Sequence, residues 1–153
     1  MFVNPAKLRF LICVAVTLMM GAELGQACTC MAPATAADAF KKSSAVFAGR
    51  VTKIYRSLLD TAGLTHTGNH RVRFEITKSW KGNRSKSAVV ITRLSGEACG
   101  FPFEERKDYL VYVAPGPLGI ETGICTGTKS IADAELEIEQ LDQLLKASKQ
   151  EKR

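Results

Sequence analysis

The clearest pattern in the chain is an alternation of polar and apolar residues between Arg71 and Trp80. Val72, Phe74 and Ile76 alternate with charged and hydroxyl side chains, and Trp80 closes the segment. A period of two is typical of a β-strand with one wet face and one buried face. We therefore expect a strand here, with these four large apolar side chains buried.

Four further segments predict strands. Ala45–Tyr55 is strand-like, and Gly49 within it indicates a bulge or a close approach of another backbone. Ala88–Thr92 is apolar on both faces. The last two predicted strands are Tyr109–Ala114, which Pro115-Gly116-Pro117 ends, and Leu118–Thr122. A polar hairpin loop is expected over residues 57–69, a turn at Gly82-Asn83 and an irregular loop over Gly96–Phe103.

Helices are expected on both sides of these strands. Pro33–Ser44 predicts a short helix, with Thr35 as its N-cap and Asp38 three residues later. Near the C-terminus, Ser130 and Asp133 resemble a capping box. Apolar residues then follow at three-four spacing, namely Ile131, Ala134, Ile138, Leu141 and Leu145. This stripe favours a helix packed on the strands, although a short dimerising coiled coil is the alternative.

Five strands flanked by helices in this order predict a mainly β protein. The expected architecture is a five-stranded Greek-key barrel of the OB type, with a short N-terminal and a longer C-terminal helix. The chain has 153 residues, of which 46% are hydrophobic and 24% charged, and no low-complexity segment or repeat is visible. This length and composition predict one folded domain.

The first 27 residues are expected to be a secretory signal peptide rather than part of the fold. Lys7 and Arg9 form a basic region, Phe10–Met20 is an apolar run, and Gly25-Gln26-Ala27 provides small residues before a cleavage point. The apolar run is shorter than the about 20 residues that span a bilayer. We thus predict a secreted protein, extracellular or periplasmic, whose single domain covers residues 28–153, and we expect it to be monomeric.

Cleavage after Ala27 would remove Lys7, Arg9 and Glu23, which lowers the formal net charge from +6 to +5. A basic surplus of this size serves solubility, or attracts anionic surfaces and acidic partners. Nucleic acid is not an expected partner, because the predicted compartment argues against it.

Four cysteines remain after cleavage, namely Cys28, Cys30, Cys99 and Cys125. An even number in an oxidising compartment predicts two disulfides. A Cys28–Cys30 bridge would strain a three-residue segment, which leaves two pairings open. A redox or copper site built on Cys28, Cys30 and Met31 is an alternative that requires free thiols.

Cys28-Thr29-Cys30 at a mature N-terminus resembles the inhibitory N-terminal domain of the tissue inhibitors of metalloproteinases (TIMP), a member of the netrin-like (NTR) modules. The resemblance covers nearly all of residues 28–128. Further matching segments are Val46-Phe47-Ala48-Gly49-Arg50-Val51, Phe74-Glu75-Ile76, Trp80-Lys81-Gly82, Cys99-Gly100-Phe101, Tyr109-Leu110-Val111-Tyr112 and Thr122 through Cys125.

The resemblance implies the disulfides Cys28–Cys99 and Cys30–Cys125 and an inhibitory role without enzymatic activity. The α-amino nitrogen and carbonyl oxygen of Cys28 would chelate the catalytic zinc of a target metalloendopeptidase, displacing its water. Thr29 would enter the primary specificity pocket, while neighbouring subsites would take Met31 and the Ala98-Cys99 segment. The zinc belongs to the protease, so no intrinsic cofactor is implied.

The chain departs from the family at several positions. Ala32 stands where the family usually carries proline, and Glu97 precedes Ala98, where a small neutral residue is common. The family's third disulfide within this domain is missing, and a simple helix replaces its cysteine-rich C-terminal domain. These differences affect potency and target more than fold.

Several other interpretations compete with inhibition. Leu24 precedes Cys28 by four residues, so a lipoprotein signal would be irregular, yet an acylated Cys28 could not chelate zinc. His66 and His70 have metal-like spacing but are expected as solvated loop residues. Asn83-Arg84-Ser85 is a glycosylation sequon by pattern. No catalytic motif supports an enzyme. The alternative function is a non-inhibitory netrin-like module that binds an exported partner.

Overall fold

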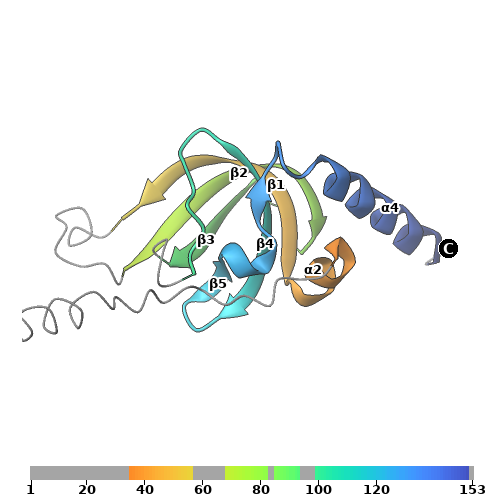
Figure 1. Ribbon diagram of the computed structural model, residues 1–153, viewed down its shortest axis with the longest axis horizontal. Coiled ribbons are helices and arrows are strands. Elements are labelled where there is room, and N and C mark those ends of the chain that lie inside the picture. Colours follow the sequence, from red (N-terminus) through yellow and green to blue (C-terminus); the bar gives the residue numbers. More distant parts are fainter. Residues whose placement is uncertain (1–34, 57–67, 83–84, 94–98, 152–153) are drawn as a thin grey trace, which may run out of the picture.

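The computed structural model describes residues 35–56, 68–82, 85–93 and 99–151. Strands are the main type of secondary structure in this part of the chain (Figure 1). The elements are α2 (Ala36–Lys42), β1 (Ala45–Tyr55), β2 (Asn69–Lys81), β3 (Ser87–Arg93), β4 (Asp108–Gly116), β5 (Gly119–Thr122), the 3₁₀ helix η1 (Ile124–Thr126), β6 (Lys129–Ser130) and α4 (Glu135–Glu151). The signal-peptide prediction lies outside the described residues.

Five of the strands close into a barrel. The order is β1-β2-β3-β5-β4, and β4 pairs back onto β1, while β6 adds two residues beside β4. The β3–β5 pairing is parallel and all the others are antiparallel. This is the predicted OB-type Greek-key barrel with a short N-terminal and a longer C-terminal helix, so the fold prediction is confirmed.

Gly49 lies where β1 pairs with both of its neighbouring strands. It lies opposite Ile76 of β2 and Tyr109 of β4, and the β1–β2 register shifts between Ala48 and Gly49. A Cβ atom at Gly49 would lie 2.8 Å from the carbonyl oxygen of Glu75. Only glycine therefore allows this close approach, as the sequence predicted.

Aromatic and branched side chains fill the barrel interior. Phe74 packs edge-on against Phe47 and Phe103, with ring centroids 5.5 and 5.2 Å apart. Phe103 in turn meets Tyr109 at 4.9 Å. The remaining interior residues are aliphatic, namely Val51, Val72, Ala88, Val90, Val111 and Val113. This apolar, closely packed core makes the barrel a rigid support for its loops.

The prediction that β2 buries a single face is wrong at the C-terminal end of the strand. The register passes from Gly49 opposite Ile76 to Ala48 opposite Lys78, so Thr77 is an extra residue. A bulge of one residue reverses the faces that follow it. Trp80 consequently packs outside the barrel against the helices, whereas Val72 and Phe74 point inward.

The strand β3 is apolar on both faces, as its sequence indicated, but only the inner face is buried. Its burial alternates, and the side chain of Val89 on the outer face is 41% exposed. An outer face of β3 without a covering layer behaves like the solvated side of an antiparallel sheet.

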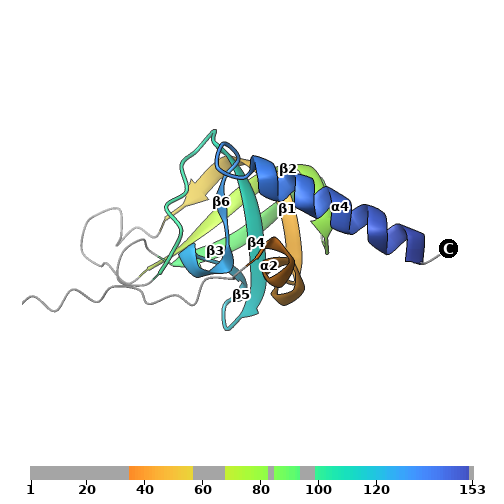
Figure 2. The ribbon, with the colours of Figure 1, turned by 45° about the vertical axis from the view of Figure 1, so that its right-hand side comes forward.

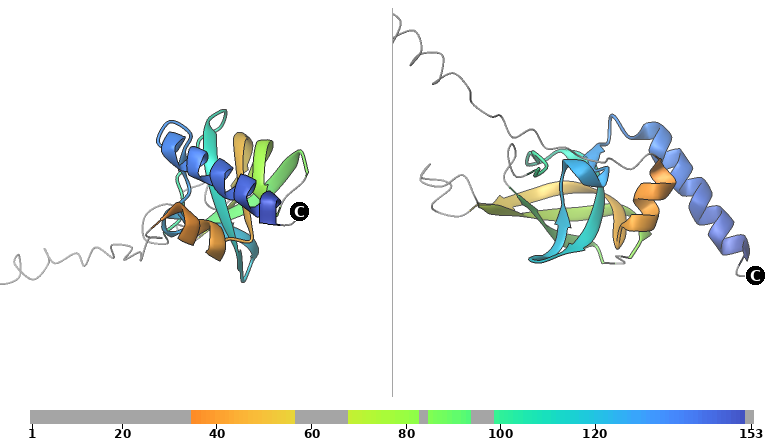
Figure 3. Two further views of the ribbon diagram at one scale, coloured as in Figure 1. Left: turned by 90° about the vertical axis from the view of Figure 1, so that its right-hand side faces the viewer. Right: turned by 60° about the horizontal axis from the view of Figure 1, so that its bottom comes forward.

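The two helices form a second layer on one end of the barrel (Figures 2 and 3). Their apolar faces share a cluster with Val46, Ala48, Trp80, Leu110 and Tyr112. The predicted stripe of α4 is confirmed, since Ala134 and Leu141 are buried while Ile131, Ile138 and Leu145 pack against the cluster. Within the described residues, no helix is both long and apolar enough to cross a membrane.

The helix ends differ in how well they were predicted. Thr35 caps α2 as expected, and its hydroxyl oxygen accepts the backbone N–H of Asp38 at 3.1 Å. The hydroxyl of Ser130 likewise accepts the N–H of Asp133 at 3.3 Å, but α4 begins later, at Glu135. The intervening residues form a tight turn in which Ala134 N–H bonds to the carbonyl of Ile131.

Polar contacts fix α4 to the barrel. Trp80 donates its indole N–H to Asp142 at 2.7 Å, and Lys78 Nζ lies 2.7 Å from the same carboxylate. These two donors hold the pKa of Asp142 below its ordinary value. Tyr112 donates its hydroxyl to Glu137 at 2.6 Å, and Lys129 pairs with that carboxylate. The position of α4 is thus set by side chains from β2, β4 and β6.

Replacing Asp142 with asparagine is expected to lower the free energy of unfolding at pH 7 by about 1 kcal/mol, because the site is partly exposed and screened. The contribution of Asp142 exists above the unfolded-state pKa of about 4 and disappears as pH falls through the lower folded-state pKa. The difference between the two proteins should therefore shrink below about pH 4. Urea unfolding followed by fluorescence of the single tryptophan, Trp80, measures it. Glu139→Gln removes an equal charge from the exposed side of α4 and should have little effect, so similar losses in both variants would contradict this account.

Candidate functional site

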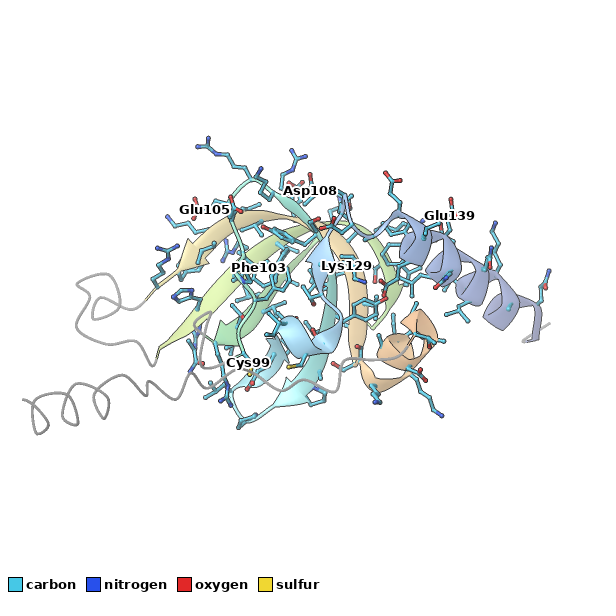
Figure 4. All side chains as sticks on the ribbon, in the orientation of Figure 1. Cys99, Phe103, Glu105, Asp108, Lys129 and Glu139 are labelled. Carbon is cyan, nitrogen blue, oxygen red and sulfur yellow. The ribbon has the colours of Figure 1, made fainter. Side chains whose placement is uncertain are left out.

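The predicted inhibitory ridge is described only at Cys99. Cys28, Thr29, Cys30, Met31 and Ala98 lie outside the described residues. Cys99 lies beside β5 and η1, far from the helix α4 that carries Glu139 (Figure 4). The structure therefore describes Cys99 and the barrel segments that surround it, on which the predicted ridge would rest.

Cys99 has an unusual backbone conformation. Its φ angle is +58°, in the left-handed region that residues other than glycine rarely adopt. Two hydrogen bonds hold the segment there. The Cys99 carbonyl accepts the N–H of Ile124 at 3.1 Å, and Phe101 donates its N–H to the Thr92 hydroxyl at 2.8 Å. Strain of about 1–2 kcal/mol persists where surrounding contacts fix the backbone in this way.

Gly123 brings η1 against this segment. A Cβ atom at Gly123 would lie 2.4 Å from the Cys99 carbonyl oxygen, closer than any side chain can approach. Glycine is therefore required where the two backbones meet. Cys125 follows within η1, so the two described cysteines belong to segments in direct contact.

Threonine hydroxyls anchor η1 to β4. Thr122 donates to the Tyr112 carbonyl at 2.8 Å, and Thr126 donates to the Gly123 carbonyl at 2.8 Å. The Thr128 hydroxyl accepts the Tyr112 N–H at 3.0 Å and lies 2.7 Å from that of Thr122. Each hydroxyl in this mostly buried cluster can donate once, so the cluster is internally satisfied. The cluster holds η1, and with it Cys125, against β4.

The two described cysteines lie on adjacent segments, as partners for a Cys-x-Cys segment would have to. Cys99 and Cys125 are both disulfide-bonded. Cysteines two positions apart in an extended chain lie about 7 Å from each other, so their partners must sit on adjacent segments. The Ile124–Cys99 hydrogen bond provides that adjacency. The predicted partners Cys28 and Cys30 lie outside the described residues, and the pairing Cys28–Cys99 and Cys30–Cys125 stays a prediction.

A cleft of about 620 Å³ separates η1 from the helices. Ile124, Lys129, Leu136 and Glu137 contribute to its lining. Burial and the hydrogen bond to Glu137 raise the pKa of the nearby Tyr112 hydroxyl far above its ordinary range, so this group stays protonated. Tyr112 and the Lys129–Glu137 pair are engaged with one another, which is typical of a structural contact rather than of acid–base catalysis.

Arg50, Asp108 and Tyr109 form polar contacts on β1 and β4. Arg50 forms a two-pronged contact with Asp108, at 3.0 and 2.8 Å, and lowers the pKa of that carboxyl group. Burial raises the pKa of Tyr109, whose hydroxyl oxygen accepts the Glu104 N–H. In the described ranges, no group of three or more His, Cys, Asp and Glu side chains could hold a metal ion.

The expectation that His70 is a solvated loop residue is wrong. His70 belongs to β2, opposite Thr92 of β3, and is partly buried. The strand begins before the predicted loop ends, because the hairpin extends further than the alternation indicated. His66 and the sequon residues Asn83 and Arg84 lie outside the described residues.

Sequence reasoning missed the residues that seat the cysteines. Thr92 shares the inward parity of Ala88 and Val90, so its burial was readable from the strand pattern. Gly123 and the threonines follow one another in Thr122-Gly123-Ile124-Cys125-Thr126-Gly127-Thr128, but no periodicity marks their contacts. No protein-family model matches the chain, and no curated protein matches it.

Proposed function

We propose that the mature chain, beginning at Cys28, is a secreted inhibitor of zinc metalloendopeptidases. In this proposal the free amine and the carbonyl oxygen of Cys28 occupy the coordination position that the protease keeps open for water. The amine binds metal only when neutral, and its reference pKa of about 8 makes that state accessible near neutral pH.

The observation that carries the proposal is the adjacency of the two disulfide-bonded cysteines. Cys99 is held in a left-handed conformation against Gly123, two residues before Cys125, and the carbonyl of Cys99 is bonded to Ile124. Two crosslinks from one tripeptide to this rigid seat would hold a chain end that otherwise frays. A ligand fixed before binding loses less entropy on association, which favours tight inhibition.

The remaining roles follow the resemblance to the tissue inhibitors of metalloproteinases. Thr29 enters the primary specificity pocket, and Met31 together with Ala98-Cys99 occupies neighbouring subsites. Zinc is supplied by the protease, and the inhibitor itself carries out no reaction. The exposed side chain of Ile124, next to the Cys99 carbonyl, adds an apolar contact beside this ridge.

The test is an inhibition assay with the mature protein and a panel of zinc endopeptidases. We expect stoichiometric inhibition of at least one of them, and none of a serine endopeptidase that lacks a metal. Intact-mass analysis of the exported protein should give the polypeptide from Cys28 with two disulfides and no lipid. Acylation of residue 28, or a mature chain that begins elsewhere, would rule out chelation by this amine.

A further inference from the structure

The outer side of β1, β2 and β3 carries a basic face that zinc chelation does not use. Residues opposite one another on the three strands form two rows. One row is Tyr55, Arg71 and Ile91, and the other is Lys53, Arg73 and Val89. We define these six residues as the basic face; it lies at the end of the barrel away from α4 (Figure 1).

Two of the three cations of the basic face lie next to one aromatic ring. Lys53 Nζ lies 5.9 Å and the Arg73 guanidinium 5.8 Å from the centre of the Tyr55 ring. Tyr55 is 41% exposed and Val89 equally so. The face thus combines three positive charges with an accessible aromatic ring and an aliphatic border.

Acidic side chains do not neutralise these cations in the described part of the chain. The salt bridges there involve Arg50, Lys78 and Lys129, and none involves Lys53, Arg71 or Arg73. Glu75 occupies the next row, opposite Arg50, whose guanidinium is bound to Asp108. Glu105 accepts the backbone N–H of Ile54 at the other edge of β1.

Like charges directly opposite on neighbouring strands destabilise a sheet. Lys53 faces Arg73, and Arg71 follows on the same side of β2, so the folded protein bears this cost when nothing is bound. A polyanion laid along the face would reverse the sign of the interaction and release counterions.

We propose that the basic face binds a linear acidic polysaccharide. Single-stranded nucleic acid is held by several aromatic rings on which successive bases stack, and this face has only Tyr55 among its described residues. One ring flanked by cations suits a sugar ring that carries sulfate or carboxylate groups. OB-type barrels use the outer strand 2–3 face for oligosaccharides, which is an analogy of fold alone.

Fluorescein-labelled heparin oligosaccharide is the probe, titrated with the mature full-length protein by fluorescence anisotropy. Arg71→Gln/Arg73→Gln is expected to weaken binding at least tenfold and to reduce the salt dependence by about one unit of slope per cation removed. Lys41→Gln/Lys42→Gln removes the same charge from exposed positions of α2 and should change affinity less than threefold. Arg71→Lys/Arg73→Lys should keep binding within about threefold, because the attraction is mainly electrostatic.

Equal weakening by the α2 variant would overturn the proposal, because binding would then follow net charge alone. An oligothymidylate or a phosphatidylglycerol vesicle that binds more tightly than heparin, with the same dependence on Arg71 and Arg73, would replace the polysaccharide with that partner. Both arginines are exposed, so their replacement should not lower the unfolding midpoint, and a lower midpoint would show that the face is structural.

Discussion

One alanine added in front of Cys28 is expected to raise the inhibition constant for a zinc endopeptidase at least about 100-fold, or about 2.8 kcal/mol of binding free energy. The extension converts the amine into an amide nitrogen, which is not basic and cannot coordinate zinc. It also places an extra residue where the metal needs a free position. Inhibition constants of the mature and extended proteins, measured with one protease, test this directly.

The matched control carries its extra alanine after Arg153, at the other end of the chain, and should inhibit like the mature protein. Both extended proteins should unfold at the same urea concentration, since chain ends contribute little to stability. Equal inhibition by the mature and N-terminally extended proteins would contradict chelation by Cys28. A panel on which neither inhibits would favour the binding-module alternative instead.

The barrel could be predicted from the sequence because its interior follows local patterns. Val72 and Phe74 alternate with Arg71 and Arg73, and this parity alone assigns the inner and outer faces of β2. The role of Gly49 could also be predicted, because a lone glycine within a strand pattern indicates a close approach of another backbone. Periodicity indicates which side chains face inward, so the residues of a closed core can be identified from the sequence.

The second layer could not be predicted to the same depth. The bulge at Thr77 moves Trp80 from the inner to the outer face, and no residue in Ile76-Thr77-Lys78 marks that shift. Likewise, Ser130 and Asp133 form the predicted hydrogen bond, yet α4 begins beyond them, since Ile131 N–H is bonded to the carbonyl of Asp108. Both outcomes depend on tertiary contacts, which override local propensity.

The candidate site was likewise predicted only in part. The cysteines were visible as residue types, and their number predicted two crosslinks. Their seat was not visible, because it is made by a left-handed Cys99, by the Gly123 contact and by hydroxyls that meet only after the barrel closes. A sequence pattern carries the chemistry of single residues but not the distance between two loops.

Replacing Gly123 with alanine is expected to lower the free energy of unfolding by about 3 kcal/mol and to abolish inhibition. Its Cβ would lie 2.4 Å from the Cys99 carbonyl oxygen, a backbone atom that can give way only if the whole segment moves. That movement would break the hydrogen bond from Ile124 and separate the two cysteines that are proposed to anchor the Cys28–Cys30 segment. Urea unfolding followed by Trp80 fluorescence and a parallel inhibition assay measure the two effects.

Gly49→Ala is the matched control, because its Cβ would likewise meet a backbone carbonyl oxygen, that of Glu75, at 2.8 Å. It should cost about 2 kcal/mol yet leave inhibition intact under conditions where the protein is folded, since β1 and β2 carry no anchor cysteine. Loss of inhibition in proportion to lost stability in both variants would mean that the barrel as a whole, rather than the contact between Cys99 and Gly123, sets the position of the proposed inhibitory terminus. Loss confined to Gly123→Ala would mean that the contact between Cys99 and Gly123 sets this position. At that contact, a hydrogen atom in place of a methyl group lets two disulfide-bonded segments meet.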